Sequence, residues 1–247
     1  MDTKNSIDAL AVNLLIKRRF VDSRVRNATM RRMMSLLHTS SSRCAAAINE
    51  GIKRGWLVRR GTTLIAVRIH FEKEYSVLIE TTEYNPHCSV NPTLTQMGNL
   101  IREAVIYNHI AKQNELSDTI RLATDPKAGE HKAHKKARRR LLKKGMCVNS
   151  ENASRLVGLS YRRICELVNV SRTKAKSIIK SMCRRGLISV THRFEEAGMS
   201  IEQFTKQIQT EYARYAPGFM IQIDGLVHIQ LANSYQIKNM NRIKLFY

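Results

Sequence analysis

The sequence is short of acidic side chains: 20 Asp and Glu stand against 42 Lys and Arg in 247 residues, a formal net charge of +22. Such a charge points to a polyanionic partner. The chain also lacks any apolar run near the ~20 residues that a membrane-spanning helix needs. Its start, MDTKNSIDAL, has no apolar core of the secretory-signal kind. We therefore expect a nucleic acid, and no membrane, as the partner.

Several features that carry chemistry are absent as well. The five cysteines are scattered without a C-x-x-C pair, which is typical of small buried hydrophobes in a reducing compartment. There is no glycine-rich phosphate loop of the Walker kind and no H-x-x-R element to accompany a tyrosine nucleophile. His131 and His134 have metal-ligand spacing, but their cationic surroundings repel a divalent ion. We predict a cytoplasmic protein that is not an enzyme, with no cofactor, catalytic residue or metal site.

Charge is divided unevenly along the chain. Residues 1–75 carry 15 basic and 6 acidic side chains, residues 76–125 carry 3 and 6, residues 126–149 carry 9 and 1, and residues 150–247 carry 15 and 7. The mildly acidic middle is a poor candidate for contact with phosphate. We expect an N-terminal domain over 1–75, an acidic helical connection over 76–125, a basic linker or helix over 126–149 and a C-terminal domain over 150–247.

The stretch SRTKAKSIIKSMCRRG, residues 171–186, predicts a short amphipathic helix behind Ser171 as its N-cap. Apolar residues recur at helical spacing on one side: Ala175, Ile178, Ile179, Met182 and Cys183. The other side carries hydroxyls and cations: Arg172, Thr173, Lys176, Ser177, Lys180 and Arg184. The helix should therefore bury one side in a core and present the other.

The flanking segments predict how this helix is embedded. Upstream, Ser160 caps the helix YRRICELV, and the short turn that follows makes a helix-turn-helix. Downstream of Gly186, residues 187–194 read as a strand. The sequence FMIQI-DG-LVHIQL at 219–231 has the strongest hairpin signal in the chain, and we expect it to supply the partners of that strand. A helical-looking insertion, SIEQFTKQIQTEYARYA at 200–216, lies between them.

Residues 150–231 thus resemble the winged-helix DNA-binding family. The resemblance implies a mainly α (α+β) fold with a small β-hairpin wing, the third helix in the major groove and the wing on the flanking backbone. Base edges would be read chiefly by Arg172, Thr173, Lys176 and Ser177. The DNA contacts expected in this module are Ser171, Arg172, Thr173, Lys174, Lys176, Ser177, Lys180, Arg184, Arg162 and Arg163.

The same pattern occurs earlier in the chain. Residues 29–59 align with residues 160–190 without a gap, and seven of the 31 positions are identical. The identities fall on cap, core and glycine positions, such as Ser40 with Ser171 and Gly55 with Gly186. We call 29–59 the first copy and 160–190 the second copy. A second winged helix is therefore predicted, with its first helix at 6–20 and wing strands at 56–58 and 63–69 closed by 59–62.

The first copy has a nearly uncharged outer face made of Ser41, Ser42, Ala45, Ala46 and Asn49, with Arg43 as its early cation. Short side chains allow close approach to a groove. An equally good interpretation is that this helix packs on another protein surface, including a second subunit of a homodimer, while the arginines hold phosphate. The contacts expected here are Arg31, Arg32, Ser41, Ser42, Arg43, Arg59 and Arg60.

Two different stretches join the copies. Residues 94–115 have apolar side chains at helical spacing and predict a core or dimer helix. Residues 127–144 hold nine cations and one acid. Such a run is often a solvated linker or helix face. Between two DNA-binding modules we favour a bridge that tracks phosphates, through Lys135, Lys136, Arg138, Arg139 and Arg140.

These expectations combine into a function. The chain is predicted to be a sequence-specific double-stranded DNA-binding protein with two winged helix-turn-helix domains, most simply a prokaryotic or phage transcriptional regulator. The alternative is a plasmid or phage replication initiator that binds origin repeats, since that family also resembles two winged helices in a chain of this length, the first often serving dimerisation. A subunit of a DNA-processing enzyme is the third interpretation.

Overall fold

The computed structural model describes residues 4–69, 92–124, 132–143, 158–200, 202–203, 220–223 and 226–238. The fold of these parts is mainly helical with small antiparallel sheets, as the sequence predicts. Among them there is no helix that combines the length and the apolar character needed to cross a membrane. The boundaries expected near residues 75, 125 and 149 lie outside the described residues.

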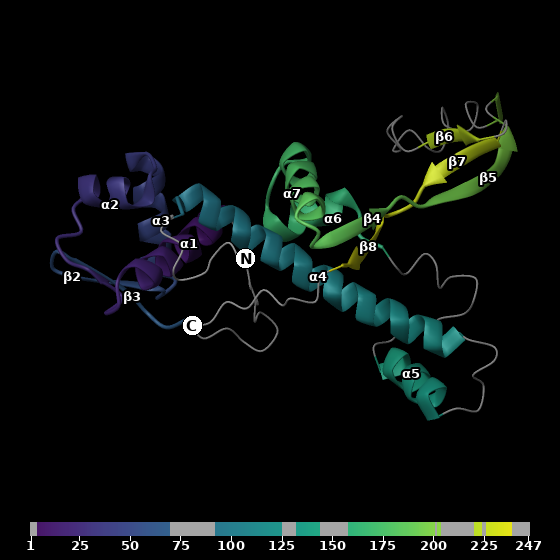
Figure 1. Ribbon diagram of the computed structural model, residues 1–247, viewed down its shortest axis with the longest axis horizontal. Helices are drawn as coiled ribbons and strands as arrows, with labels where there is room; N and C mark the ends of the chain where they lie inside the picture. The colour runs from purple at the N-terminus through teal and green to yellow at the C-terminus, as the bar shows by residue number, and fades with distance from the viewer. Residues whose placement is uncertain are drawn as a thin grey trace. The chain divides into compact units, whose positions relative to one another are not determined.

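Seven helices and eight strands are described, and Figure 1 labels them along the chain. The helices are α1 (Lys4–Arg19), α2 (Met30–Leu37), α3 (Ser41–Lys53), α4 (Leu94–Thr124), α5 (Lys132–Lys143), α6 (Tyr161–Val168) and α7 (Arg172–Arg184). The strands are β1 (Arg24–Val25), β2 (Leu57–Arg60), β3 (Thr63–Ala66), β4 (Ile188–Thr191), β5 (Phe194–Ser200), β6 (Met220–Ile223), β7 (Leu226–Gln230) and β8 (Ser234–Ile237). They fall into two compact units. The first unit holds α1 to α3, β1 to β3, α4 as far as Asn108 and residues 164–185; the second holds the rest of α4, α5, residues 158–163 and 186–238.

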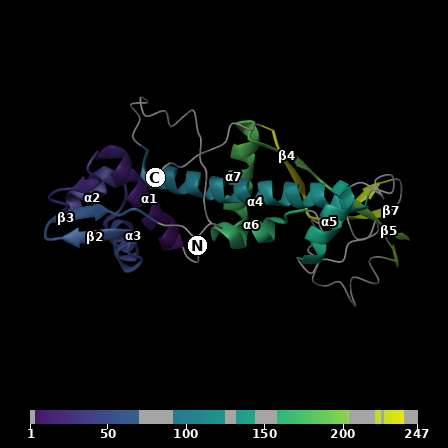
Figure 2. The same ribbon diagram turned by 90° about the horizontal axis from the view of Figure 1, so that it is seen from below.

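The first unit is built around α1. All side chains from Ser6 to Ile16 are buried, so this helix has no solvent face over that length. This burial arises because α3, the β1–β3–β2 sheet and α4 all contact α1 (Figures 1 and 2). Asn13, the polar residue at the centre, donates from Nδ2 to the carbonyl oxygens of Trp56 (2.6 Å) and Val67 (3.0 Å). It thereby fixes α1 to the base of the β2–β3 hairpin.

A buried ion pair connects α1 to α3. Asp8 is 2 % exposed, and its two carboxylate oxygens accept from Nε (2.7 Å) and Nη2 (2.8 Å) of Arg43. The third nitrogen of Arg43 donates to Thr95 Oγ1 of α4 (2.8 Å). The hydrogen bond from Arg43 to Asp8 raises the pKa of Arg43. A Cβ on Gly98 of α4 would lie 3.6 Å from Asp8 Oδ1, so α4 approaches the ion pair closely.

The β2–β3 hairpin is shorter and tighter than expected. Leu57 pairs with Ala66 and Arg60 with Thr63, so the turn is Gly61–Thr62 alone. Gly61 has φ 56°, a conformation that favours glycine. Arg59 and Arg60 were predicted in the turn, but they are the last two residues of β2. Strand β1, which has two residues and pairs with β3, was not predicted.

The internal repeat is confirmed at the level of the backbone. Helices α2 and α3 and strand β2 begin and end at the residues that align with the ends of α6, α7 and β4. The first helix of each copy is followed by a left-handed residue: His38 has a φ of 48° and Asn169 a φ of 47°. The second helix of each copy is followed by a glycine with a positive φ: 71° at Gly55 and 69° at Gly186. One local backbone is therefore used twice, although few side chains are shared.

The copies separate after β2 and β4. β2 pairs with β3 across a two-residue turn, whereas β4 pairs with β8, so residues 192–233 stand where the first copy has only that turn. The same hydrogen bond marks the position in both: Ala28 N donates to Thr62 O (2.7 Å), and Leu159 N donates to Asn233 O (2.9 Å). The second copy therefore carries a long insertion at the tip of an otherwise equivalent hairpin.

The predicted partner of the strand after Gly186 was wrong. The hairpin expected at 219–231 is confirmed as β6 and β7, with Ile223 opposite Leu226. It pairs through β7 with β5, however, and β4 pairs with β8 instead. The chain leaves β4 directly into β5 and returns from β7 directly into β8, so one antiparallel ladder continues in two sections. The insertion predicted at 200–216 lies outside the described residues, apart from Ser200 at the end of β5 and residues 202–203.

In the second unit, α5 packs on the end of α4. The helix predicted over 94–115 continues to Thr124, and its expected core role is confirmed by the burial of Leu100, Ile101, Ile106 and Ile110. Residues 132–143 of the expected basic linker form a helix that buries His134, Ala137 and Leu141. His134 Nδ1 donates to the carbonyl oxygen of Leu122 (2.9 Å). Of the two predicted alternatives, a basic linker or a helix, residues 132–143 form the helix, and it has one packed side.

The Asp8–Arg43 pair should be essential to the first unit. Because D8N leaves a guanidinium without its buried counter-charge, we expect a loss of about 3 kcal/mol in the free energy of unfolding. The matched control is D22N. Asp22 faces Arg26 at 3.6 Å, but both side chains are largely exposed, so its removal should change stability by less than about 0.5 kcal/mol. Urea unfolding followed by circular dichroism measures both, and equal losses would contradict the assigned role.

Candidate nucleic-acid interface

Helix α7 forms where the sequence predicts it and for the predicted reasons. Ser171 has extended backbone angles (φ −65°, ψ 158°), and its hydroxyl oxygen accepts from the backbone N–H of Lys174, so it caps the helix. Ala175, Ile178, Ile179 and Met182 are buried along one side. The helix ends at Arg184 and the chain turns at Gly186. One side of α7 is thus committed to packing.

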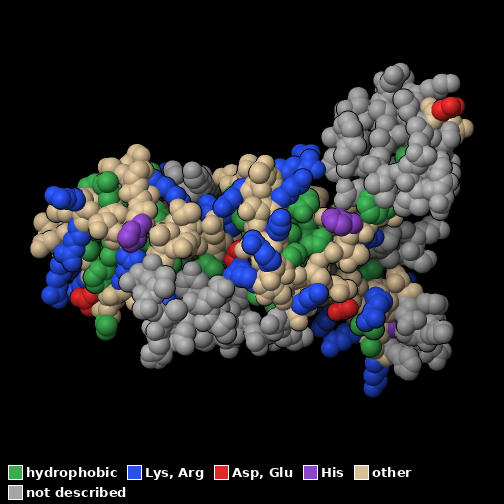
Figure 3. All heavy atoms as spheres, turned by 45° about the horizontal axis from the view of Figure 1, so that its top comes forward, with side chains coloured by type: hydrophobic (Ala, Val, Ile, Leu, Met, Phe, Trp, Pro, Cys, Tyr) green, Lys and Arg blue, Asp and Glu red, His purple; other side chains and the backbone are tan. Residues whose placement is uncertain are grey.

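The opposite side of α7 is open. The six predicted outer residues are all exposed: Arg172, Thr173, Lys176, Ser177, Lys180 and Arg184. Lys174 is half-buried. Among the residues that the structure describes, no acidic side chain forms an ion pair with Lys176, Lys180 or Arg184. Two hydroxyl groups lie among four cations on one face. Figure 3 shows Lys and Arg side chains gathered where α6 and α7 lie.

The ends of α6 and α7 add to this arrangement. Arg162 and Arg163 are exposed in the first turn of α6, where the Ser160 hydroxyl accepts from the backbone N–H of Arg163 (3.2 Å). Arg185, which follows α7, forms an ion pair with the buried carboxylate of Glu103 on α4. Arg185 is therefore an anchor for α7, whereas Arg162 and Arg163 are exposed at the surface.

Helix α3 repeats this geometry with a different surface. Ser41, Ser42 and Asn49 are exposed, and Ala45 and Ala46 are half-buried, so the face is neutral. The cation predicted to contact DNA here, Arg43, has all three guanidinium nitrogens bound to Asp8 and Thr95. Arg43 therefore has a structural role in the first unit, and its contact with DNA stays a prediction.

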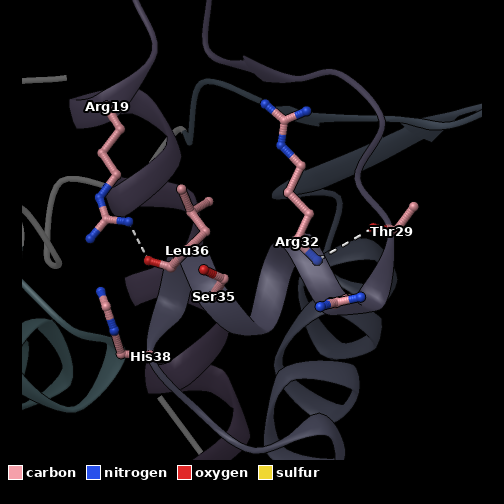
Figure 4. Close-up of a pocket in the computed structure, with 7 residues that line it drawn as sticks. Arg19, Thr29, Arg32, Ser35, Leu36 and His38 are labelled. Atoms are coloured by element: carbon pink, nitrogen blue, oxygen red, sulfur yellow. Dashed lines mark hydrogen bonds between the residues drawn. The ribbon is translucent and has the colours of Figure 1, made fainter.

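The exposed cations predicted to contact DNA in and next to the first copy lie on β2 and α2, on either side of α3 in the sequence. Arg59 and Arg60 are exposed at the end of β2. Arg31 and Arg32 are exposed at the start of α2 and line a concavity of about 580 Å³ with Arg19, Ser35 and His38. In Figure 4 the side chains of Arg19 and Arg32 lie on either side of this concavity.

Arg19 belongs to this surface but was not predicted. One guanidinium nitrogen donates to the carbonyl oxygen of Leu36, at the end of α2, and the other to that of Pro92 (3.1 Å). Burial lowers the pKa of Arg19, and the charge of Arg18 lowers it further. In the sequence Arg19 is one of three cations ending a helix, and nothing distinguishes it from its neighbours.

The cations of α5 form a separate surface. Lys135, Lys136, Arg138, Arg139 and Arg140 are all exposed. The side chains that fix the helix, His134 among them, lie on its other side. The predicted site residues therefore occur in three groups: on α6–α7, around α2 and the β2–β3 hairpin, and on α5.

The chemistry on offer is recognition of anions. Exposed guanidinium, ammonium and hydroxyl groups donate hydrogen bonds to phosphate oxygens and to base edges. Within the described ranges no cluster of three or more His, Cys, Asp or Glu side chains could hold a metal ion. Cys44 is fully buried, and burial raises the pKa of its thiol, which keeps it protonated.

The N-cap residues of α3 and α7, Ser40 and Ser171, allow a test of how much the Ser171 cap stabilises its helix. Because its hydroxyl caps α7, we expect S171A to lower the free energy of unfolding by about 1 kcal/mol. Ser40, the first-copy counterpart, makes no side-chain cap bond and contacts Ser42 Oγ at 3.4 Å. S40A should therefore lose less than about half as much in the same urea titration. Equal losses would show that the cap bond of Ser171 contributes nothing.

Comparison with known proteins adds no relative. None of the protein-family models matches the chain, and no curated protein or solved structure is significantly similar to it. A functional conclusion therefore depends on the exposed groups of α7 and their surroundings.

Proposed function

We propose that this protein binds double-stranded DNA in a sequence-specific manner through two winged-helix modules. The observation that carries the proposal is the side of α7 that presents four cations and two hydroxyls to solvent, opposite an apolar side on which Ala175, Ile178, Ile179 and Met182 are buried and Cys183 is half-buried. An α-helix fits the major groove, where hydrogen-bond donors distinguish one base pair from another. The proposal needs no catalytic step and no cofactor.

The order of elements supports the assignment of the modules. In the first unit α1, β1, α2, α3, β2 and β3 follow one another, and the sheet order is β1–β3–β2. A helix-turn-helix followed by a two-stranded wing has this arrangement. The second copy repeats α2, α3 and β2 residue for residue, with β8 in the place of β3. We therefore infer a second module whose wing carries the insertion 192–233.

The residues divide into two roles. Arg172, Thr173, Lys176 and Ser177 lie in the first half of α7, the part of a recognition helix that reaches base edges, and we assign them to reading. Lys180, Arg184, Arg162 and Arg163 are assigned to phosphates. Phosphate contacts set position and affinity, whereas base contacts set the preferred sequence.

The first module is assigned to positioning. Its α3 face offers small neutral groups, so the cations that remain are on its flanks: Arg31, Arg32, Arg59 and Arg60. Two arginines at the end of a hairpin suit a phosphate or a narrow minor groove. This module therefore adds affinity, and α3 is left to approach either a groove or a second subunit.

The biological role that follows most simply is regulation of transcription in a prokaryote or phage, in the cytoplasm. One observation favours replication initiation as a second candidate. The chain carries two modules with the same backbone but unlike outer faces, one cationic and one neutral, which suits a protein whose second module reads a repeat while the first contacts a subunit. A selection from a random DNA library separates the two: a palindromic site favours a symmetric regulator, and a direct repeat favours an initiator.

Substitutions on α7 should separate the recognition of bases from the binding of phosphates. We expect K176A to lower the preference for the selected site over random duplex by about 1–3 kcal/mol. R184A should weaken binding to both duplexes alike and reduce the slope of log affinity against log salt by about 0.9. Fluorescence anisotropy at several salt concentrations measures both effects.

The control for these variants is R121A. It removes a positive charge from an exposed position near the end of α4, where Arg121 faces Asp118 at 3.8 Å. It should leave the preference unchanged. If K176A, like R184A, weakens binding to the selected site and to random duplex by the same factor, α7 binds DNA without recognising its bases. The proposal of sequence specificity is then wrong.

A further inference from the structure

Helix α5 combines a high charge with a small anchor. Its sequence, KAHKKARRRLLK, has seven Lys and Arg residues and a histidine but no acid. All seven cations are exposed, while His134, Ala137 and Leu141 are buried. His134 joins the helix to α4 through its hydrogen bond to the Leu122 carbonyl, and Leu141 lines a groove shared with α4. Little therefore offsets the mutual repulsion of the cations.

The spacing of the cations makes this repulsion direct. Lys132, Lys135, Lys136 and Arg139 lie three or four residues apart, so each faces like charges across one helical turn. Like charges at this spacing destabilise a helix. Lys132 and Lys135 also lie in the first turn, where the helix dipole disfavours cations. We call these four residues the outer face of α5.

The inner edge of α5 differs from this outer face. Arg140 and Lys143 line a groove of about 930 Å³ together with Glu115 and Asp118 of α4. None of the four residues of the outer face lines this groove. Among the described residues no acidic side chain forms an ion pair with any of the seven cations of α5. The outer face is therefore the part of this charge that lies away from the acids of the groove.

We propose that the outer face of α5 binds the phosphate backbone of duplex DNA without regard to sequence, and that this binding stabilises the helix on α4. The inference rests on the proposed function, because it takes DNA as the polyanion, but it adds a third surface separate from both modules. Twelve residues make a helix about 18 Å long, which spans about five phosphates of one strand. Phosphates would replace the repulsion between neighbouring cations with attraction to a shared partner.

A membrane fits this surface less well. An interfacial helix buries an apolar side in the lipid, next to its basic side. In α5 the apolar side is already buried, and within this fully described helix Leu142 is the one large apolar side chain that is exposed. The observations therefore favour a polyanion contacted through charge alone.

Hydrogen exchange of the α5 amides in the full-length protein tests the proposal. The probe is a 20-base-pair duplex of random sequence, and the variant is K135Q/K136Q/R139Q, whose helix propensity is almost unchanged. In the free variant, relief of repulsion should slow α5 exchange by about fivefold. Saturating duplex should slow exchange in the natural protein about tenfold, and in the variant less than about twofold. The slope of log affinity against log salt should fall by about two to three.

The matched control is R140Q/K143Q, which removes like charges from the same helix on the side that faces Glu115 and Asp118. Arg140 and Lys143 each lie four residues from one cation of the outer face, so the control relieves fewer repulsive pairs and should slow exchange in the free protein less than the outer variant does. The proposal is overturned if the outer variant exchanges as fast as the natural protein, or if duplex protects α5 equally in both. It is also overturned if vesicles of equal phosphatidylserine and phosphatidylcholine protect α5 and the duplex does not.

The two proposals fail separately. If duplex leaves α5 unprotected while K176A still abolishes the preference for a selected site, the third surface is wrong and the reading helix stands. If duplex protects α5 but no library selection yields a preferred site, sequence specificity is wrong and the third surface stands.

Discussion

The first unit depends on the ion pair between Asp8 and Arg43. A buried carboxylate is tolerated where a charged partner and hydrogen bonds compensate its lost hydration, and Arg43 supplies two such bonds while it reaches Thr95 with its third nitrogen. One side chain therefore joins α1, α3 and α4. This structural use has a consequence for function, because the guanidinium that α3 could have offered to DNA is turned inward. The neutral face of the first copy follows as much from packing as from composition.

The two copies show how one backbone serves different surfaces. Cap, turn and glycine positions are kept, while Ala45 and Asn49 of α3 are replaced by Lys176 and Lys180 on α7. Inward positions also changed. A Cβ on Gly51 would lie 2.5 Å from Leu57 Cδ1, so α3 meets its hairpin closely, whereas the second copy has a buried Met182 at the equivalent position. Each copy thus preserves the local backbone but adjusts its packing and its charge independently.

Local signals in the sequence were sufficient to predict local structure. Ser160 and Ser171 begin α6 and α7 through their side-chain caps, and Gly186 follows the end of α7 with a positive φ. The Asp224–Gly225 pair between alternating runs indicated the β6–β7 hairpin. Partners far apart in the chain were not predictable. β5 contains two glutamates and a glycine, residues that disfavour strands, and it forms because β7 offers it a ladder. Likewise, no sequence pattern associates Asp8 with Arg43, and the structural use of Arg43 could be found only in three dimensions.

The distribution of cations bears on how specificity could arise in so basic a chain. In our proposal the arginines of α2 and β2 and the outer face of α5 contact phosphates, so they raise affinity for every duplex by a similar factor. The ratio between a target and random DNA is unaffected by such a factor. It must then come from α7, where Thr173 and Ser177 stand between cations on one exposed face. In our proposal, most of the charge serves affinity for any duplex and one helix selects the site.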